Sequence, residues 1–313
     1  MKRRDFLAAL GGIWAMGRGV PPVRGPRAGA SDTLVERWSW AMGQPVHLQL
    51  FARSEAEGYA AAQAALAELR RVEAALSRFD DTSDLSELNR RAGRPALSVG
   101  ADLAAVLAAS LRLHRATSGA FDPAVEPLMR AWGFVVPRVG EPTAAELAEA
   151  RAAVRAAGIV VEGNRVALRG AATRLDLGGI GVGYGLDRAG AVLRAAGIQR
   201  AFLDVSGDCL AIGAPPGEEG WLVEVADPAR TGRIVASTRL RDAALATSSN
   251  QLSVVRYGRA IRGHVIDPAS GWPATGCTQV SVVARSGLEA DALSTAMLVS
   301  PIPFRGVRRA YTV

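Results

Sequence analysis

The stretch that decides the fold is Arg174-Leu-Asp-Leu-Gly-Gly-Ile-Gly-Val-Gly-Tyr-Gly-Leu-Asp-Arg188. It opens with a short apolar run, carries five glycines within the eight residues 178–185, and continues into a segment with helical spacing. This order predicts a strand, a glycine-rich turn and a helix. Glycines let a backbone approach a ligand closely, and a helix N-terminus attracts phosphate. The stretch fits neither the dinucleotide-binding frame nor the P-loop, so phosphate binding and tight helix packing both remain open.

Helical patterns dominate the chain before this stretch, and strand patterns dominate it afterwards. Apolar residues recur at helical spacing in 54–77, 101–116 and 142–157, after an alternating strand at 46–50, and 159–168 is typical of a hairpin. Further strands are predicted at 201–205, 209–212, 221–225, 253–257 and 279–284, and a last helix at 288–299. Polar segments 247–250 and 263–273 are expected between strands. The distribution predicts an α+β fold.

Residues 1–30 have the features of an export signal. Arg3-Arg4 precedes Phe6-Leu7, an apolar run spans 7–16, and Ala28-Gly29-Ala30 is a small-residue cleavage pattern. We therefore expect a twin-arginine-type signal peptide, a mature domain over 31–313 and a periplasmic location, in which association with the inner membrane stays open.

Charge and cysteine content bear on whether the chain binds nucleic acid, holds a metal through cysteines or forms a disulfide. Removing residues 1–30 takes away six basic residues and one acidic residue, which lowers the net charge from +7 to +2. The remaining chain has no long basic block, so a nucleic-acid partner is not expected. Cys209 and Cys277 lack metal-site spacing, and the sequence leaves open whether they pair.

Two polar constellations carry candidate chemistry. Asp291 and Thr295 are four residues apart at the start of the last predicted helix and project from one face, where their oxygens suit Mg²⁺. The alternative is an acid in the first helical turn that opposes the helix dipole. His264, three residues before Asp267-Pro268, is either a proton acceptor or a residue that packs the turn.

The polar motifs, taken together and in order, resemble the ApbE family of flavin transferases, which move FMN from FAD onto a threonine of an acceptor protein. The matching segments are Ala41-Met-Gly43, Ser77-Arg-Phe-Asp80 with Ser83-Asp-Leu-Ser-Glu-Leu-Asn89, Thr117-Ser-Gly-Ala-Phe-Asp-Pro123 with Trp132-Gly-Phe134, Leu175-Asp-Leu-Gly-Gly-Ile-Gly-Val-Gly-Tyr-Gly-Leu-Asp187, Ser206-Gly-Asp208, Ala246-Thr-Ser248, His264-Val-Ile-Asp-Pro-Ala-Ser-Gly271 and Ala290-Asp-Ala-Leu-Ser-Thr295. Each motif is weak alone, but eight in register are strong. The resemblance implies a T-fold-related α+β architecture with helices packed on a largely antiparallel sheet.

The resemblance also implies a set of site residues. A magnesium ion is expected on Asp291, Thr295 and the main-chain carbonyl of Gly179, and His264 is expected beside the phosphate that is transferred. The residues implied for binding FAD, the substrate, are Met42, Phe79, Ala120, Phe121, Asp122, Asp176, Thr247, Ser248 and Ile266.

The chain departs from the family pattern at three of these motifs. Val182 stands where many members have lysine, Ser249 replaces a glycine after Thr247-Ser248, and Phe79 replaces a tyrosine. By resemblance the expected reaction is Mg²⁺-dependent transfer of FMN to an acceptor threonine with release of AMP, and the acceptor is expected to be an exported or membrane-bound redox subunit. The alternatives are hydrolysis of FAD to FMN and AMP, and an exported FAD-binding protein without catalysis.

Overall fold

A seven-stranded antiparallel sheet forms the centre of the computed structural model, which describes residues 32–313. Its strand order is β1-β2-β6-β7-β10-β13-β14. The bounds are Thr33–Ala41 (β1), Gln44–Ala52 (β2), Ala201–Val205 (β6), Asp208–Ile212 (β7), Ala243–Ser249 (β10), Gln279–Ala284 (β13) and Arg309–Thr312 (β14). Alternate residues of the inner strands are buried toward one face, as the expected alternation in β2 requires. The expected α+β fold is confirmed.

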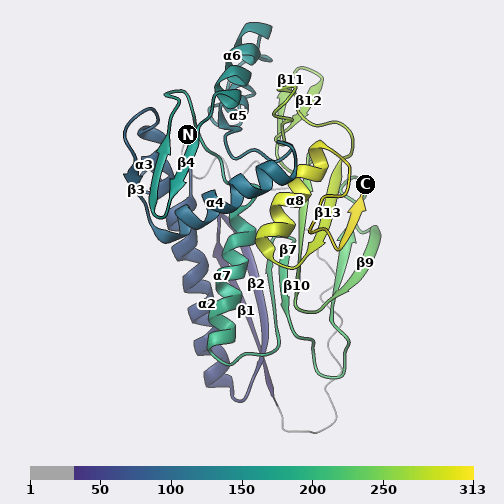
Figure 1. The fold of residues 1–313 in the computed structure, drawn as a ribbon. Coiled ribbons are helices and arrows are strands. Elements are labelled where there is room, and N and C mark those ends of the chain that lie inside the picture. The colour runs from purple at the N-terminus through teal and green to yellow at the C-terminus, as the bar shows by residue number, and fades with distance from the viewer. Residues whose placement is uncertain (1–31) are drawn as a thin grey trace.

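Three helices cover that face: α2 (Glu55–Leu76), α7 (Gly181–Ala195) and α8 (Gly287–Val299). Figure 1 shows them side by side in front of the sheet. The Ser54 hydroxyl accepts a hydrogen bond from the Glu57 amide and so caps the start of α2, where the sequence predicts a helix. The apolar residues of α2 pack against the sheet and against α7.

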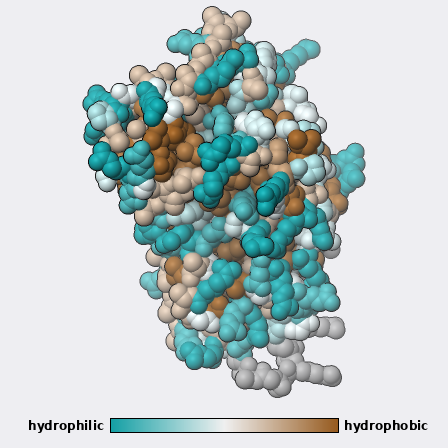
Figure 2. Space-filling model, in the orientation of Figure 1, coloured by the Kyte–Doolittle hydropathy of each residue, from teal (hydrophilic) through white to brown (hydrophobic). Residues whose placement is uncertain are grey.

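Two smaller lobes and one hairpin surround this core. The first lobe holds α3 (Asp84–Arg90), α4 (Ala101–Ala116) and a small sheet of β3 (Leu97–Ser98), β4 (Ile159–Glu162) and β5 (Arg165–Leu168). The second holds α5 (Glu126–Ala131), α6 (Ala144–Arg155), β11 (Val254–Tyr257) and β12 (Ala260–Gly263), and the hairpin of β8 (Trp221–Ala226) and β9 (Ile234–Leu240) covers the outer face of the large sheet. Figure 2 shows apolar side chains gathered over β4.

The helices α7 and α8 cross with their backbones in contact. A Cβ atom added at Gly183 would lie 2.1 Å from the carbonyl oxygen of Gly287, so only glycine fits there. The Asp187 carboxylate accepts hydrogen bonds from the amides of Gly287 and Leu288, at 2.7 and 2.9 Å, and so fixes the start of α8. Tight packing is thus one role of the glycine-rich stretch.

Two predictions of local structure were wrong. Residues 174–177 form no strand, because the Leu175 main chain bonds to the Asn89 side chain and the Asp176 amide donates to the Pro123 carbonyl. Residues 247–249 do not lie between strands but end β10, where buried hydroxyl pairs replace apolar contacts. The strands β1, β9, β10, β12 and β14, the two-residue strand β3 and the short α5 were not predicted.

Several other expectations concern the termini, the cysteines and membranes. The expected signal peptide, 1–30, lies outside the described residues. Cys209 is unpaired in the outer-face core, and Cys277 is unpaired and packs against the inner-face core. Across 32–313 the helices are too short or too polar to cross a membrane.

Candidate functional site

An oxygen-rich cluster forms where the start of α7, the middle of α8 and the end of β10 meet. The Asp291 carboxylate is buried, at 5% exposure, and accepts a hydrogen bond of 3.0 Å from the Gly183 amide. One turn later, the Thr295 hydroxyl lies 3.1 Å from that of Ser248. A Cβ atom added at Gly179 would lie 2.8 Å from the same Thr295 hydroxyl. The structure therefore brings together Gly179, Asp291, Thr295 and Ser248.

Burial without a cation makes this cluster electrostatically unfavourable. Burial raises the pKa of Asp291 well above its usual range, and the nearby Asp208 carboxylate raises it further. Burial also raises the pKa of Asp208 to about 7, although the Thr247 amide donates to its carboxylate at 2.9 Å. A bound cation relieves this cost, since a metal neutralises buried carboxylates.

The donor set fits a hard cation such as Mg²⁺. It offers a carboxylate with hydroxyl and main-chain oxygens, and hard cations prefer oxygen ligands. Residues 32–313 contain no group of three or more His, Cys, Asp or Glu side chains arranged as a metal site. Asp291 lies in the second turn of α8, and the first-turn acid is Glu289, so the helix-dipole alternative for Asp291 is wrong.

A second cluster gathers around His264, which follows β12. Burial lowers the pKa of His264, the Asp176 carboxylate opposes this shift, and the Arg78 guanidinium adds to it. The imidazole Nδ1 atom is buried and lacks a hydrogen-bond partner among the described residues. The Asp176 carboxylate lies 2.7 Å from Arg78 Nε. Burial thus favours the unprotonated form of His264, and its Nδ1 atom has no hydrogen-bond partner among the described residues.

Asp267, three residues after His264, stabilises its own turn. Its carboxylate accepts hydrogen bonds from the amides of Ala269 and Ser270. The charged side chains that act on His264 are Asp176 and Arg78. Asp176 precedes Gly179 by three residues, so one short segment joins the His264 cluster to the oxygen-rich cluster.

Met42 and Phe79 lie at the same end of the molecule as these clusters. Met42 sits in the β1–β2 turn with φ +57°, and its amide donates a 2.7 Å hydrogen bond to Glu73 in the last turns of α2. Its thioether packs toward Gly185 of α7. Phe79 follows the end of α2 and is 72% exposed, with the Arg78 guanidinium 4.2 Å from its ring centre.

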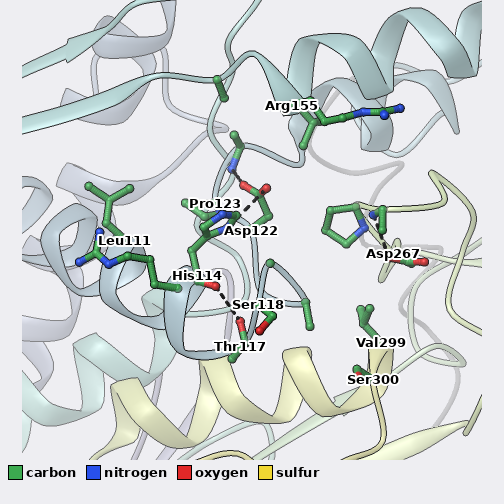
Figure 3. A pocket seen from close by; sticks show the side chains of 18 of the residues that line it. Leu111, His114, Thr117, Ser118, Asp122, Pro123, Arg155, Asp267, Val299 and Ser300 are labelled. Carbon is green, nitrogen blue, oxygen red and sulfur yellow. Dashed lines mark hydrogen bonds and ion pairs between the residues drawn. The ribbon is translucent and has the colours of Figure 1, made fainter.

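The loop at 120–122 borders a pocket of about 960 Å³. Ala120 and Asp122 line this pocket, together with Asp267 and Val299 (Figure 3). Burial raises the pKa of Asp122, whose carboxylate lies 3.6 Å from His114 Nδ1. The Asp176 amide bonds to Pro123, so this loop also adjoins the His264 cluster.

Three residues implied by resemblance do not point their side chains into the site. Phe121 and Ile266 are buried at 3% exposure in two separate apolar cores. The Thr247 hydroxyl bonds to Ser281, while neighbouring Ser248 bonds to α8, because successive strand residues face opposite sides. Only the main chain of these three can meet a ligand there.

Sequence reasoning missed Arg78, Asp208 and Ser294 as neighbours of the site. Arg78 and Asp208 lie inside motifs that were recognised, Ser77-Arg-Phe-Asp80 and Ser206-Gly-Asp208, which was the available signal. Val182, at the position of a common lysine, is buried in the inner-face core and brings no charge to the site.

Comparisons with known proteins point in one direction. The model of the ApbE family matches residues 42–305. A FAD:protein FMN transferase of Treponema pallidum is 31% identical over 79% of this chain and 73% of its own length. The structure of an ApbE protein from Thermotoga maritima has a TM-score of 0.78 and 28% identity over 85% of this chain and 87% of that one. A Pseudomonas stutzeri flavinyl transferase structure, apo form, has a TM-score of 0.75 and 26% identity over 87% and 86%.

Proposed function

This chain belongs to the ApbE family, and from that membership we propose that it transfers FMN from FAD to a threonine hydroxyl of an acceptor protein. The observation that carries the proposal is the junction of two clusters through residues 176–179. One cluster offers oxygens for a cation, and the other offers a neutral imidazole beside a carboxylate. A pyrophosphate needs the first, and a hydroxyl nucleophile needs the second.

The reaction is a displacement at the phosphorus of the FMN half of FAD. The threonine oxygen forms a new bond to this phosphorus, and the bond from phosphorus to the AMP oxygen breaks. AMP leaves, and the threonine proton passes to the imidazole of His264. The lowered pKa of His264 keeps the imidazole unprotonated and able to accept that proton.

Gly179, Asp291 and Thr295 are the residues that would hold Mg²⁺, and Ser248 lies within hydrogen-bond distance of Thr295. When bound, the ion neutralises charge on the phosphate oxygens. The flavin nucleotide would meet Met42, Phe79 and Asp176, and the main chain around 120–122 and 266. These assignments extend the family resemblance and are supported by the positions of the side chains.

The acceptor is proposed to be an exported or membrane-bound redox subunit with a target threonine. The proposal rests on the Arg3-Arg4 signal pattern, which predicts that this chain acts in the periplasm after export in folded form. Replacing both arginines by lysine should leave unprocessed protein in the cytoplasm, and normal periplasmic accumulation would contradict this route.

The test of the function combines purified residues 31–313, FAD, Mg²⁺ and a candidate acceptor. The expected results are a fluorescent acceptor band in a denaturing gel and an equal amount of AMP by chromatography. An acceptor whose target threonine is replaced by alanine is the control. Free FMN in place of labelled acceptor would show hydrolysis, and intact FAD after prolonged incubation would show binding without catalysis.

A further inference from the structure

Arg78 connects three segments of the site through one planar group. Its Nε atom lies 2.7 Å from the Asp176 carboxylate, and Nη2 donates a 3.5 Å hydrogen bond to the Phe134 carbonyl. Its guanidinium carbon lies 4.2 Å from the centre of the Phe79 ring. The side chain is 19% exposed, so these contacts hold a largely buried cation.

Arg78 contacts Asp176 and Phe79, and both are among the residues assigned above to binding of the flavin nucleotide. Asp176 is anchored by its amide to Pro123, and its carboxylate accepts a 2.8 Å hydrogen bond from the Gly178 amide at one oxygen and forms an ion pair with Arg78 at the other. Phe79 lies beyond the end of α2 and is highly exposed, so helix packing does not fix its ring. The Arg78 guanidinium lies over this ring and so constrains its orientation.

Lysine cannot reproduce this arrangement. A guanidinium is planar and can pair with a carboxylate through its edge while its face lies on an aromatic ring, whereas an ammonium is a point charge. Arg78 also brings a positive charge to the site. Val182, at the position of a common lysine, is apolar and buried, whereas the Arg78 guanidinium lowers the pKa of His264.

We propose that Arg78 is a positioning residue for flavin transfer, which holds the Asp176 carboxylate and the Phe79 ring in one fixed arrangement for the flavin nucleotide. The inference rests on the proposed function and adds to it a residue that determines the affinity for FAD. Its effect reaches the substrate through Phe79 and Asp176, so it should appear mainly in FAD binding.

The experiment compares Arg78→Gln, Arg78→Lys, Phe79→Leu and the double variant Arg78→Lys/Phe79→Leu. Arg70→Gln is the matched control, since Arg70 is an exposed arginine of α2 that bonds to Ser39. FAD affinity is measured by flavin fluorescence, transfer by the acceptor assay at saturating FAD, and folding by melting temperature. Arg78→Gln should weaken FAD binding about tenfold, whereas Arg70→Gln should bind FAD with wild-type affinity.

A double-mutant cycle separates positioning from general support of the fold. Arg78→Lys and Phe79→Leu should each weaken FAD binding, and the double variant should bind about as weakly as the weaker single variant, because both changes disrupt the same stack. Additive effects, or wild-type affinity in Arg78→Gln, would overturn the inference. A wild-type protein that binds no FAD would instead refute the proposed function.

Discussion

At the scale of single residues, replacing His264 tests whether this side chain takes part in the transfer reaction or in FAD binding. Its imidazole lies beside Asp176 and Arg78, and its buried Nδ1 atom has no hydrogen-bond partner within residues 32–313. His264→Ala should reduce transfer by ~10²–10⁴, as expected for loss of a general base, and keep FAD affinity within a few-fold of wild type. Acceptor labelling and fluorescence titration of one preparation measure both. A destabilised variant with normal turnover would limit His264 to packing.

The same residue predicts the acidic limb of the pH profile. Because burial lowers the folded-state pKa of His264, the imidazole stays able to accept a proton below the ordinary value of about 6.5. Transfer should therefore decline only at a pH below that value. Asp176→Asn removes the charge that supports the protonated form and should move this limb to lower pH. A limb that moves upward would contradict the pairing of Asp176 with His264.

At the scale of elements, the crossing of α7 and α8 sets the position of Asp291. Gly183→Ala would place a methyl group against the Gly287 carbonyl, force the helices apart and stretch the bond from the Gly183 amide to Asp291. The expected loss is at least about 1–3 kcal/mol in the free energy of unfolding, measured with urea. Gly181→Ala is the control, since a Cβ atom there meets nothing within 4 Å. Equal stability of the two variants would contradict this account.

The elements also show what the sequence could predict. The long helices were predictable because their caps and apolar stripes are local, as with Ser54 and α2. The end of β10 was not, because the half-buried Thr247 and Ser248 form hydroxyl pairs with Ser281 and Ser294, far away in the sequence. Arg78 was missed for the same reason, since only the folded chain brings Asp176 to it. The motifs thus predicted most residues of the candidate site, but only the folded structure shows which of their side chains contact one another.

At the scale of the whole molecule, the buried carboxyl groups of the proposed cation site oppose folding. The buried Asp291 carboxylate repels Asp208, and both have raised pKa values. Asp291→Asn removes that repulsion and keeps an oxygen that can accept from Gly183. The metal-free variant should therefore melt at or above the wild-type temperature.

Mg²⁺ should raise the melting temperature of the wild-type protein, because ligand binding to the folded state stabilises it. The same addition should leave Asp291→Asn nearly unchanged. Calorimetry with and without Mg²⁺ measures both effects. An equal shift in the two proteins would place the ion elsewhere.

The placement of the two cysteines has a practical consequence. Cys209 lies opposite Leu245, which pairs with Val283, and Gln279 is four residues farther along β13, about 13 Å at strand spacing. Cys277 lies before Gln279, beyond the reach of a disulfide to Cys209. The fold therefore does not depend on a disulfide between these two cysteines. The deeply buried Cys209 thiol can then serve as a reporter, whose rate of alkylation records how often the molecule opens.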